Sequence, residues 1–133
     1  MSQALPELSQ IIEQMRSAMS QLPSAIEKAA RADPSVVLEH ARSSGFAMPQ
    51  GQGALDGETR TLIYLAVALA TSNHACTAAM VNKARVQRIA ATKLLEAFHI
   101  ARFAQATQVL GNAEPLFDLI DEQRVLSSMA TAD

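Results

Sequence analysis

The stretch TLIYLAVALATSNHACTAAMVN, residues 61–82, contains no Asp, Glu, Lys or Arg. A segment of this length could cross a bilayer, but its centre is the polar run TSNH, and polar groups at mid-membrane need partners inside a bundle. We therefore expect a buried central helix of a helical bundle, capped by Asp56 and running to about residue 82. The only cysteine of the chain, Cys76, lies within this predicted helix.

Helical patterns continue on both sides of the central segment. Apolar residues recur at steps of three and four near the N-terminus, and Asp33 with Pro34 marks a helix boundary. The segment 45–57 holds four of the five glycines and is the clearest loop. No strand pattern or internal repeat is found, so we predict an all-α fold of about six helices. The predicted helices cover about residues 7–20, 24–32, 34–44, 56–82, 91–110 and 115–129.

The length of 133 residues fits one domain, 1–133, with N-terminal helices in 1–44 and a C-terminal helix in 112–133. There is no Trp, one Tyr and four Phe, so Ala, Leu, Ile, Val and Met must build the core. This mixture favours helices over strands.

Charge is unevenly distributed along the chain. The net charge of −2 argues against nucleic acid as the main partner. Residues 83–103 carry five basic side chains against one acidic, and residues 112–133 carry five acidic against one basic. These are either two solvated helix faces or a subunit contact in which the basic segment of one chain meets the acidic tail of another.

A single cysteine excludes an intramolecular disulfide and a Cys-x-x-Cys site within one chain. The N-terminal stretch MSQALPELSQ shows no secretory signal pattern, and a cytoplasmic location in a reducing compartment is expected.

Two quoted motifs carry a family resemblance. ALDGETRTLIYLAVALA at residues 54–70 is followed by a cysteine-bearing continuation and then by TKLLEAFHIARFAQATQVLG at residues 92–111. This arrangement resembles the carboxymuconolactone decarboxylase and alkylhydroperoxidase D-like superfamily, with its pattern L-D-x-x-T-R-E-L-I-x-L-A-V-A-x-A, then C-x-x-C-x-x-x-H, then a helix E-I-x-E-A. The resemblance covers about residues 54–111. The matching residues are Leu55, Asp56, Thr59, Arg60, Leu62, Ile63, Leu65, Ala66, Val67, Ala68, Ala70, Leu94, Glu96 and Ala97.

The chain departs from that pattern where the family's chemistry lies. In peroxidase-type relatives a glutamate follows the arginine, and two cysteines and a histidine follow on the next segment. The corresponding residues here are Thr61, Asn73, Cys76 and Met80. A two-cysteine cycle needs a resolving thiol and groups that move the thiol proton, and only the one cysteine is present. The chain is therefore not expected to run the family's disulfide-linked peroxidase cycle.

Cys76 could still be a catalytic residue on its own. His74 is two residues away and would point about 200° from Cys76 on a helix, whereas His40 or His99 could approach from another helix. A buried free cysteine usually behaves as a small apolar residue. The alternatives are a structural Cys76 or a one-cysteine thiol chemistry with an external resolving thiol.

Two further polar features are weighed. Glu96 and His99 have the spacing of a helix-borne metal-ligand pair, but no second such pair is found, so no metal site is expected. The polar run TSNH predicts either hydrogen bonds between helices or subunits, or the lining of a pocket. The candidate pocket-lining residues are Thr61, Asn73, His74, Met80 and His99, beside Cys76.

Three functions remain open. The first is a family member that has lost its peroxidase site and is an oligomeric binding or assembly module for a small apolar ligand or a protein partner. The second is an antioxidant enzyme that uses Cys76 alone. The third is a decarboxylase that acts on a carboxylated lactone through His and Arg side chains. The resemblance implies a homo-oligomer, a trimer or hexamer; no cofactor, nucleic-acid partner or membrane partner is expected, and catalysis is the less favoured reading.

Overall fold

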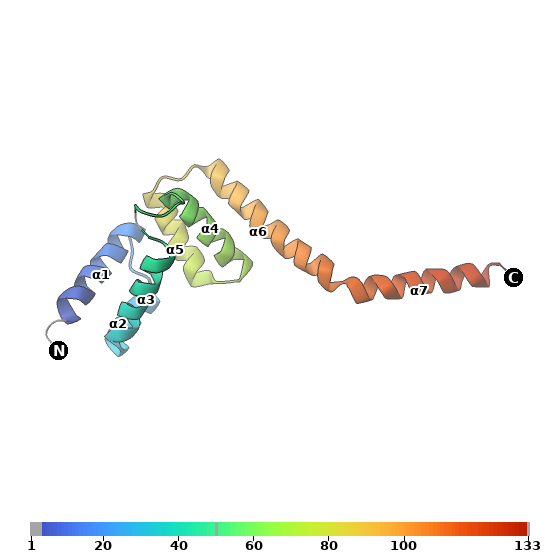
Figure 1. Cartoon of the computed structure of the whole chain (residues 1–133), viewed down its shortest axis with the longest axis horizontal. Helices are drawn as coiled ribbons and strands as arrows, with labels where there is room; N and C mark the ends of the chain where they lie inside the picture. Colours follow the sequence, from blue (N-terminus) through green and yellow to red (C-terminus); the bar gives the residue numbers. More distant parts are fainter. Residues whose placement is uncertain (1–3, 50, 133) are drawn as a thin grey trace.

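The computed structural model describes residues 4–49 and 51–132, which form seven helices and no strand (Figure 1). The predicted all-α fold is confirmed. The helices are α1 (Ala4–Met19), α2 (Ser24–Ala32), α3 (Pro34–Ala47), α4 (Gly57–Ala70), α5 (His74–Val86), α6 (Ala91–Asn112) and α7 (Glu114–Ala130).

The predicted central helix over 56–82 is wrong, because the chain reverses direction at Thr71–Asn73. Ser72 adopts a left-handed backbone conformation with φ +56°. The Asn73 side chain accepts a hydrogen bond from the Cys76 N–H at 3.1 Å and so caps α5. The TSNH run is therefore a turn between two antiparallel helices, and its polar groups close the helix ends. This break raises the number of helices from about six to seven in the described residues.

Helix α4 is the centre of the fold, since it packs against both α5 and α6. Its N-terminus is capped as predicted: the Asp56 carboxylate accepts a hydrogen bond from the Thr59 N–H at 2.7 Å. Alanines fill much of the contact, and their small side chains let the helix backbones approach closely. The buried apolar residues of these three helices are Leu65, Ala68, Met80, Ala84, Ala97 and Ala101.

The N-terminal helices join the same packed body. Helix α1 packs against α5 and α3, and α2 packs against α3. The predicted boundary at Asp33 and Pro34 is confirmed, with the Asp33 carboxylate accepting from the Ser35 N–H at 3.0 Å. Helix α3 continues through Gly45 to Ala47, so it ends three residues later than predicted. Val37 is fully buried on this helix.

The C-terminal part of the chain leaves this body (Figure 1). We define the C-terminal arm as residues 106–130, which comprise the end of α6 and all of α7. Helix α7 contacts no other described helix except α6, and no residue of the arm is buried. Its largely exposed apolar side chains are Val109, Leu110, Leu116, Phe117, Leu119, Val125, Leu126 and Met129.

Candidate functional site

The turn end of the α4–α5 hairpin holds the only thiol. Cys76 lies in the first turns of α5 and faces α4, where the Tyr64 hydroxyl is 3.1 Å from its Sγ. Both side chains are half-buried. The hydrogen bond with Cys76 raises the pKa of Tyr64, and burial adds to the rise. Tyr64 therefore stays protonated at neutral pH and can donate its O–H to the sulfur.

The histidines lie apart from this thiol. His74 is the exposed first residue of α5, and His40 is exposed on α3. His99 is exposed on α6, with its ring centroid 5.5 Å from that of Phe98. None of the three makes a hydrogen bond with Cys76 in the part of the chain that the structure describes. Across residues 4–49 and 51–132, no three His, Cys, Asp or Glu side chains gather as a metal site.

The remaining family positions have structural contacts. Thr61 is 0% exposed. Its hydroxyl proton has two acceptors within reach, the Gly57 carbonyl at 3.0 Å and the Gln87 amide oxygen at 2.8 Å. Met80 is buried in the core, and Asn73 caps α5. The structure thus brings Cys76 close to Asn73 but places Thr61 toward the opposite end of the hairpin.

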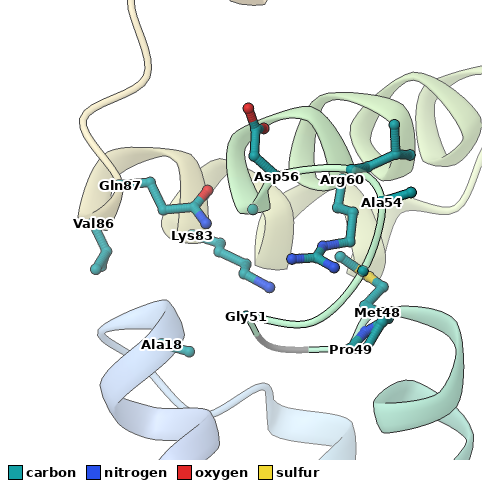
Figure 2. Close-up of a pocket in the computed structure, with 13 residues that line it drawn as sticks. Ala18, Met48, Pro49, Gly51, Ala54, Asp56, Arg60, Lys83, Val86 and Gln87 are labelled. Atoms are coloured by element: carbon teal, nitrogen blue, oxygen red, sulfur yellow. The ribbon is translucent and has the colours of Figure 1, made fainter.

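A cavity of about 640 Å³ lies at that opposite, open end of the hairpin (Figure 2). The glycine-rich loop that precedes α4 forms one wall, and the last turns of α5 form another. Ala18 at the end of α1 and Met48 after α3 close the sides. The charged residues that line it are Asp56, Arg60 and Lys83.

Arg60 and Lys83 point into the same space in Figure 2, whereas the Asp56 carboxylate points away. The Arg60 Nη1 atom is buried and has no hydrogen-bond partner among the described residues. Burial lowers the pKa of Lys83, and the positive charge of Arg60 lowers it further. Two cations therefore share a cavity in which no carboxylate faces them.

The sequence analysis did not identify Tyr64 as a neighbour of Cys76, and it did not identify Arg60 and Lys83 as residues that line a cavity. A usable signal was present in the turn residues. In an antiparallel helical hairpin the two helices lie side by side, so a turn at Ser72 places residues of α4 next to residues of α5. Arg60, twelve residues before Ser72, then lines the same cavity as Lys83, eleven residues after it, and the Tyr64 side chain reaches Cys76 nearer the turn. The unbroken helix that we predicted would have placed each pair far apart along one axis.

An all-helical protein built on a helical hairpin, with one thiol on its second helix, is the class that this fold and site define. The model of the carboxymuconolactone decarboxylase family matches residues 38–118, which is more than half of the chain. The chain therefore belongs to this family. The match includes the predicted span 54–111 and extends from α3 into α7.

Two further findings concern the relatives of the chain and its capacity to span a membrane. Comparison with curated proteins finds no match. Within the described residues, no helix has the length and apolar character needed to cross a membrane.

Proposed function

We propose that this member of the family is a self-assembling binding module that does not run a two-cysteine peroxidase cycle. The observation that carries the proposal is the C-terminal arm, which presents eight large apolar side chains and buries none of them within its own chain. Exposed apolar surface on this scale is typical of a surface that is covered in an assembly.

The total exposed area supports the same conclusion. The chain exposes 10027 Å². A compact monomer of 14.2 kDa would expose about 6,800 Å². The excess of about 3,200 Å² exceeds the roughly 1,000 to 2,500 Å² that each partner buries in an obligate interface.

Charge supports a second copy of this chain as the occupant. Helix α7 carries four acidic residues and one basic residue, and it contacts only α6. The basic segment 83–103 also exposes large apolar residues on α6, among them Leu95, Ile100 and Phe103. The acidic, apolar α7 is complementary in charge to the basic segment 83–103 as a whole, whose basic residues are spread over α5, α6 and the loop between them.

The family's catalytic positions support loss of the peroxidase cycle. Asn73 caps a helix, Thr61 joins α4 to Gln87, and Met80 packs in the core. None of these three side chains is a thiol or a group that titrates near neutral pH. Cys76 therefore has no partner in the described residues that could resolve an oxidised sulfur as a disulfide.

The assembly is tested by sedimentation of the full chain and of Leu126→Asp. Leu126 is 66% exposed on α7, and a carboxylate there would be desolvated in the interface. The native chain should sediment as an oligomer and the variant as a smaller species with unchanged helix content. Val36→Asp is the matched control, because Val36 is 52% exposed on α3, outside the arm. A monomeric native chain at high concentration would overturn the proposal.

A second candidate function, one-cysteine thiol chemistry, is favoured by one observation, the half-buried Cys76 hydrogen-bonded to Tyr64. In that chemistry the thiolate attacks a hydroperoxide, and the O–O bond breaks to give a sulfenic acid and an alcohol. One external thiol then condenses with the sulfenic acid to a mixed disulfide and water, and a second external thiol releases the cysteine and leaves as a disulfide with the first. The test is thiol-dependent hydroperoxide consumption by the native chain, Cys76→Ser and Tyr64→Phe. If the native chain consumes hydroperoxide and Cys76→Ser does not, the thiol enzyme is favoured. If the native chain consumes it no faster than buffer alone, the binding module remains the only proposed function.

A further inference from the structure

The open end of the α4–α5 hairpin carries an inference beyond the proposed assembly. Two cations, the Arg60 guanidinium and the Lys83 ammonium, line one cavity of about 640 Å³. This volume lies within the range of about 300 to 1,000 Å³ found for small-molecule sites. The cavity lies at the end of the hairpin opposite Cys76 and contains none of the family's catalytic positions.

Neither cation forms an ion pair with a carboxylate among the described residues. Arg60 Nη1 is buried without a hydrogen-bond partner in residues 4–49 and 51–132, and an unpaired buried donor is unfavourable. The Asp56 carboxylate lines the same cavity and keeps its negative charge while it accepts the 2.7 Å hydrogen bond from the Thr59 N–H. This hydrogen bond lowers the pKa of Asp56, and the charge of Arg60 contributes to the decrease. Figure 2 shows the carboxylate directed away from the other two charged groups. Two cations against one carboxylate leave the lining with a net positive charge. The cavity is therefore electropositive.

The loop before α4 passes close to the Arg60 guanidinium. A Cβ atom added at Gly53 would lie 2.5 Å from Arg60 Nη1, so a larger residue there would displace the end of the Arg60 side chain. A guanidinium suits an oxyanion, because its planar fork of N–H donors matches two oxygens at once.

The other walls of the cavity are apolar. Met48, Pro49, Leu55 and Val86 line it together with alanine and glycine. An inorganic anion would contact only the two cations and leave these walls in water. A ligand with an apolar body would cover them as well and gain from their burial.

We propose that Arg60 and Lys83 bind the oxyanion group of a small organic acid, a carboxylate or a phosphate monoester, whose apolar body lies against Met48, Pro49, Leu55 and Val86. The anion supplies the negative charge that the two cations lack. Bound anion also relieves the repulsion between Arg60 and Lys83. The site does not require self-assembly, since all of its described walls belong to one chain.

The test is calorimetric titration of the full chain with octanoate, phenyl phosphate and the neutral octanamide, in a buffer free of phosphate. The native chain should bind at least one of the two anions, and octanamide at least about 10-fold more weakly, since a charge-assisted hydrogen bond contributes about 1.5 to 3 kcal/mol. The stronger of the two anions identifies the headgroup as carboxylate or phosphate.

Three variants complete the experiment. Arg60→Gln and Lys83→Gln should each weaken anion binding about 10-fold or more. Arg85→Gln should leave it unchanged, because Arg85 lies on the same helix and bonds to Asn82 outside the cavity. Lys83→Gln keeps the test valid if Arg60→Gln unfolds. Absence of binding by both anions, equal binding of octanamide, or an equal loss in Arg85→Gln would overturn the proposal, whatever the oligomeric state.

Discussion

The α4–α5 hairpin and the C-terminal arm both contain large apolar side chains, but the hairpin buries some of them and the arm buries none. Leu65 of α4 is 6% exposed, whereas Leu126 of α7 is 66% exposed. Isolated helices of this length are marginal in water without a packed face. The hairpin finds its packing within the chain, and the arm has none there. The comparison teaches that the hairpin is packed within the chain itself, whereas the apolar side chains of the arm are left for the assembly that we propose.

The strongest test of this difference is to truncate a leucine to alanine in each of the two regions. Leu65→Ala should lower the free energy of unfolding by about 3 kcal/mol, since it leaves a cavity in the core. Leu126→Ala should change it by less than about 0.5 kcal/mol in dilute solution, where the arm is exposed. Urea denaturation below the concentration of assembly measures both. Equal effects would mean that the arm packs on its own chain.

A hydroxyl group gives a smaller contrast of the same kind. Thr61→Val keeps the buried shape but removes the hydroxyl proton that the Gly57 carbonyl or the Gln87 amide oxygen accepts, and should reduce stability by about 1 kcal/mol. Thr131→Val at the end of the arm removes an exposed hydroxyl that donates to the Ser128 carbonyl at 3.0 Å. This second change should have almost no effect on urea denaturation. A larger effect at Thr131 than at Thr61 would reverse the assignment of the two regions.

The smallest expected effect concerns pH and Lys83. Burial, with the charge of Arg60, lowers the pKa of Lys83 below the ordinary lysine value of 10.5. Between the lowered pKa and 10.5, the unfolded chain binds more protons than the folded chain, so this group makes stability rise with pH. At neutral pH the charged, half-buried ammonium is unfavourable, and Lys83→Met should be slightly more stable than the native chain.

That advantage of Lys83→Met should shrink as the pH rises through the lowered pKa. The difference between the two urea midpoints, measured at neutral and alkaline pH, isolates the lysine from other groups that titrate there. Arg85→Met is the control, since Arg85 is exposed on the same helix and should show no such trend. A constant difference across the pH range would contradict the assignment.

The helices outside the centre could be predicted from the sequence because their signals are local. The boundary at Asp33–Pro34 and the cap at Asp56 were identified by residue types that close helix ends. The hairpin was missed because apolar runs on both sides of TSNH concealed a turn. Thr, Ser and Asn bond readily to nearby backbone, and four polar residues in succession fit a turn better than a helix centre.

The candidate site was only partly predictable for the same reason. Cys76 was identified as the one thiol, but its contact with Tyr64 exists only because the chain reverses at Ser72. The placement of Arg60 and Lys83 in one cavity depends on the same reversal. Contacts between separate elements depend on the tertiary arrangement, which periodicity along one helix does not contain.

Because the arm is separate from the hairpin, the two regions are expected to form their contacts at different times during folding. The two helices of the hairpin are joined by three residues, so their contacts close quickly and independently of chain concentration. A partner for the arm arrives only by diffusion, at a rate that rises with concentration. With the proposed assembly, refolding of this chain is expected to consist of a fast unimolecular step followed by a slower bimolecular one, and in the interval between them the eight apolar side chains of the arm are open to aggregation.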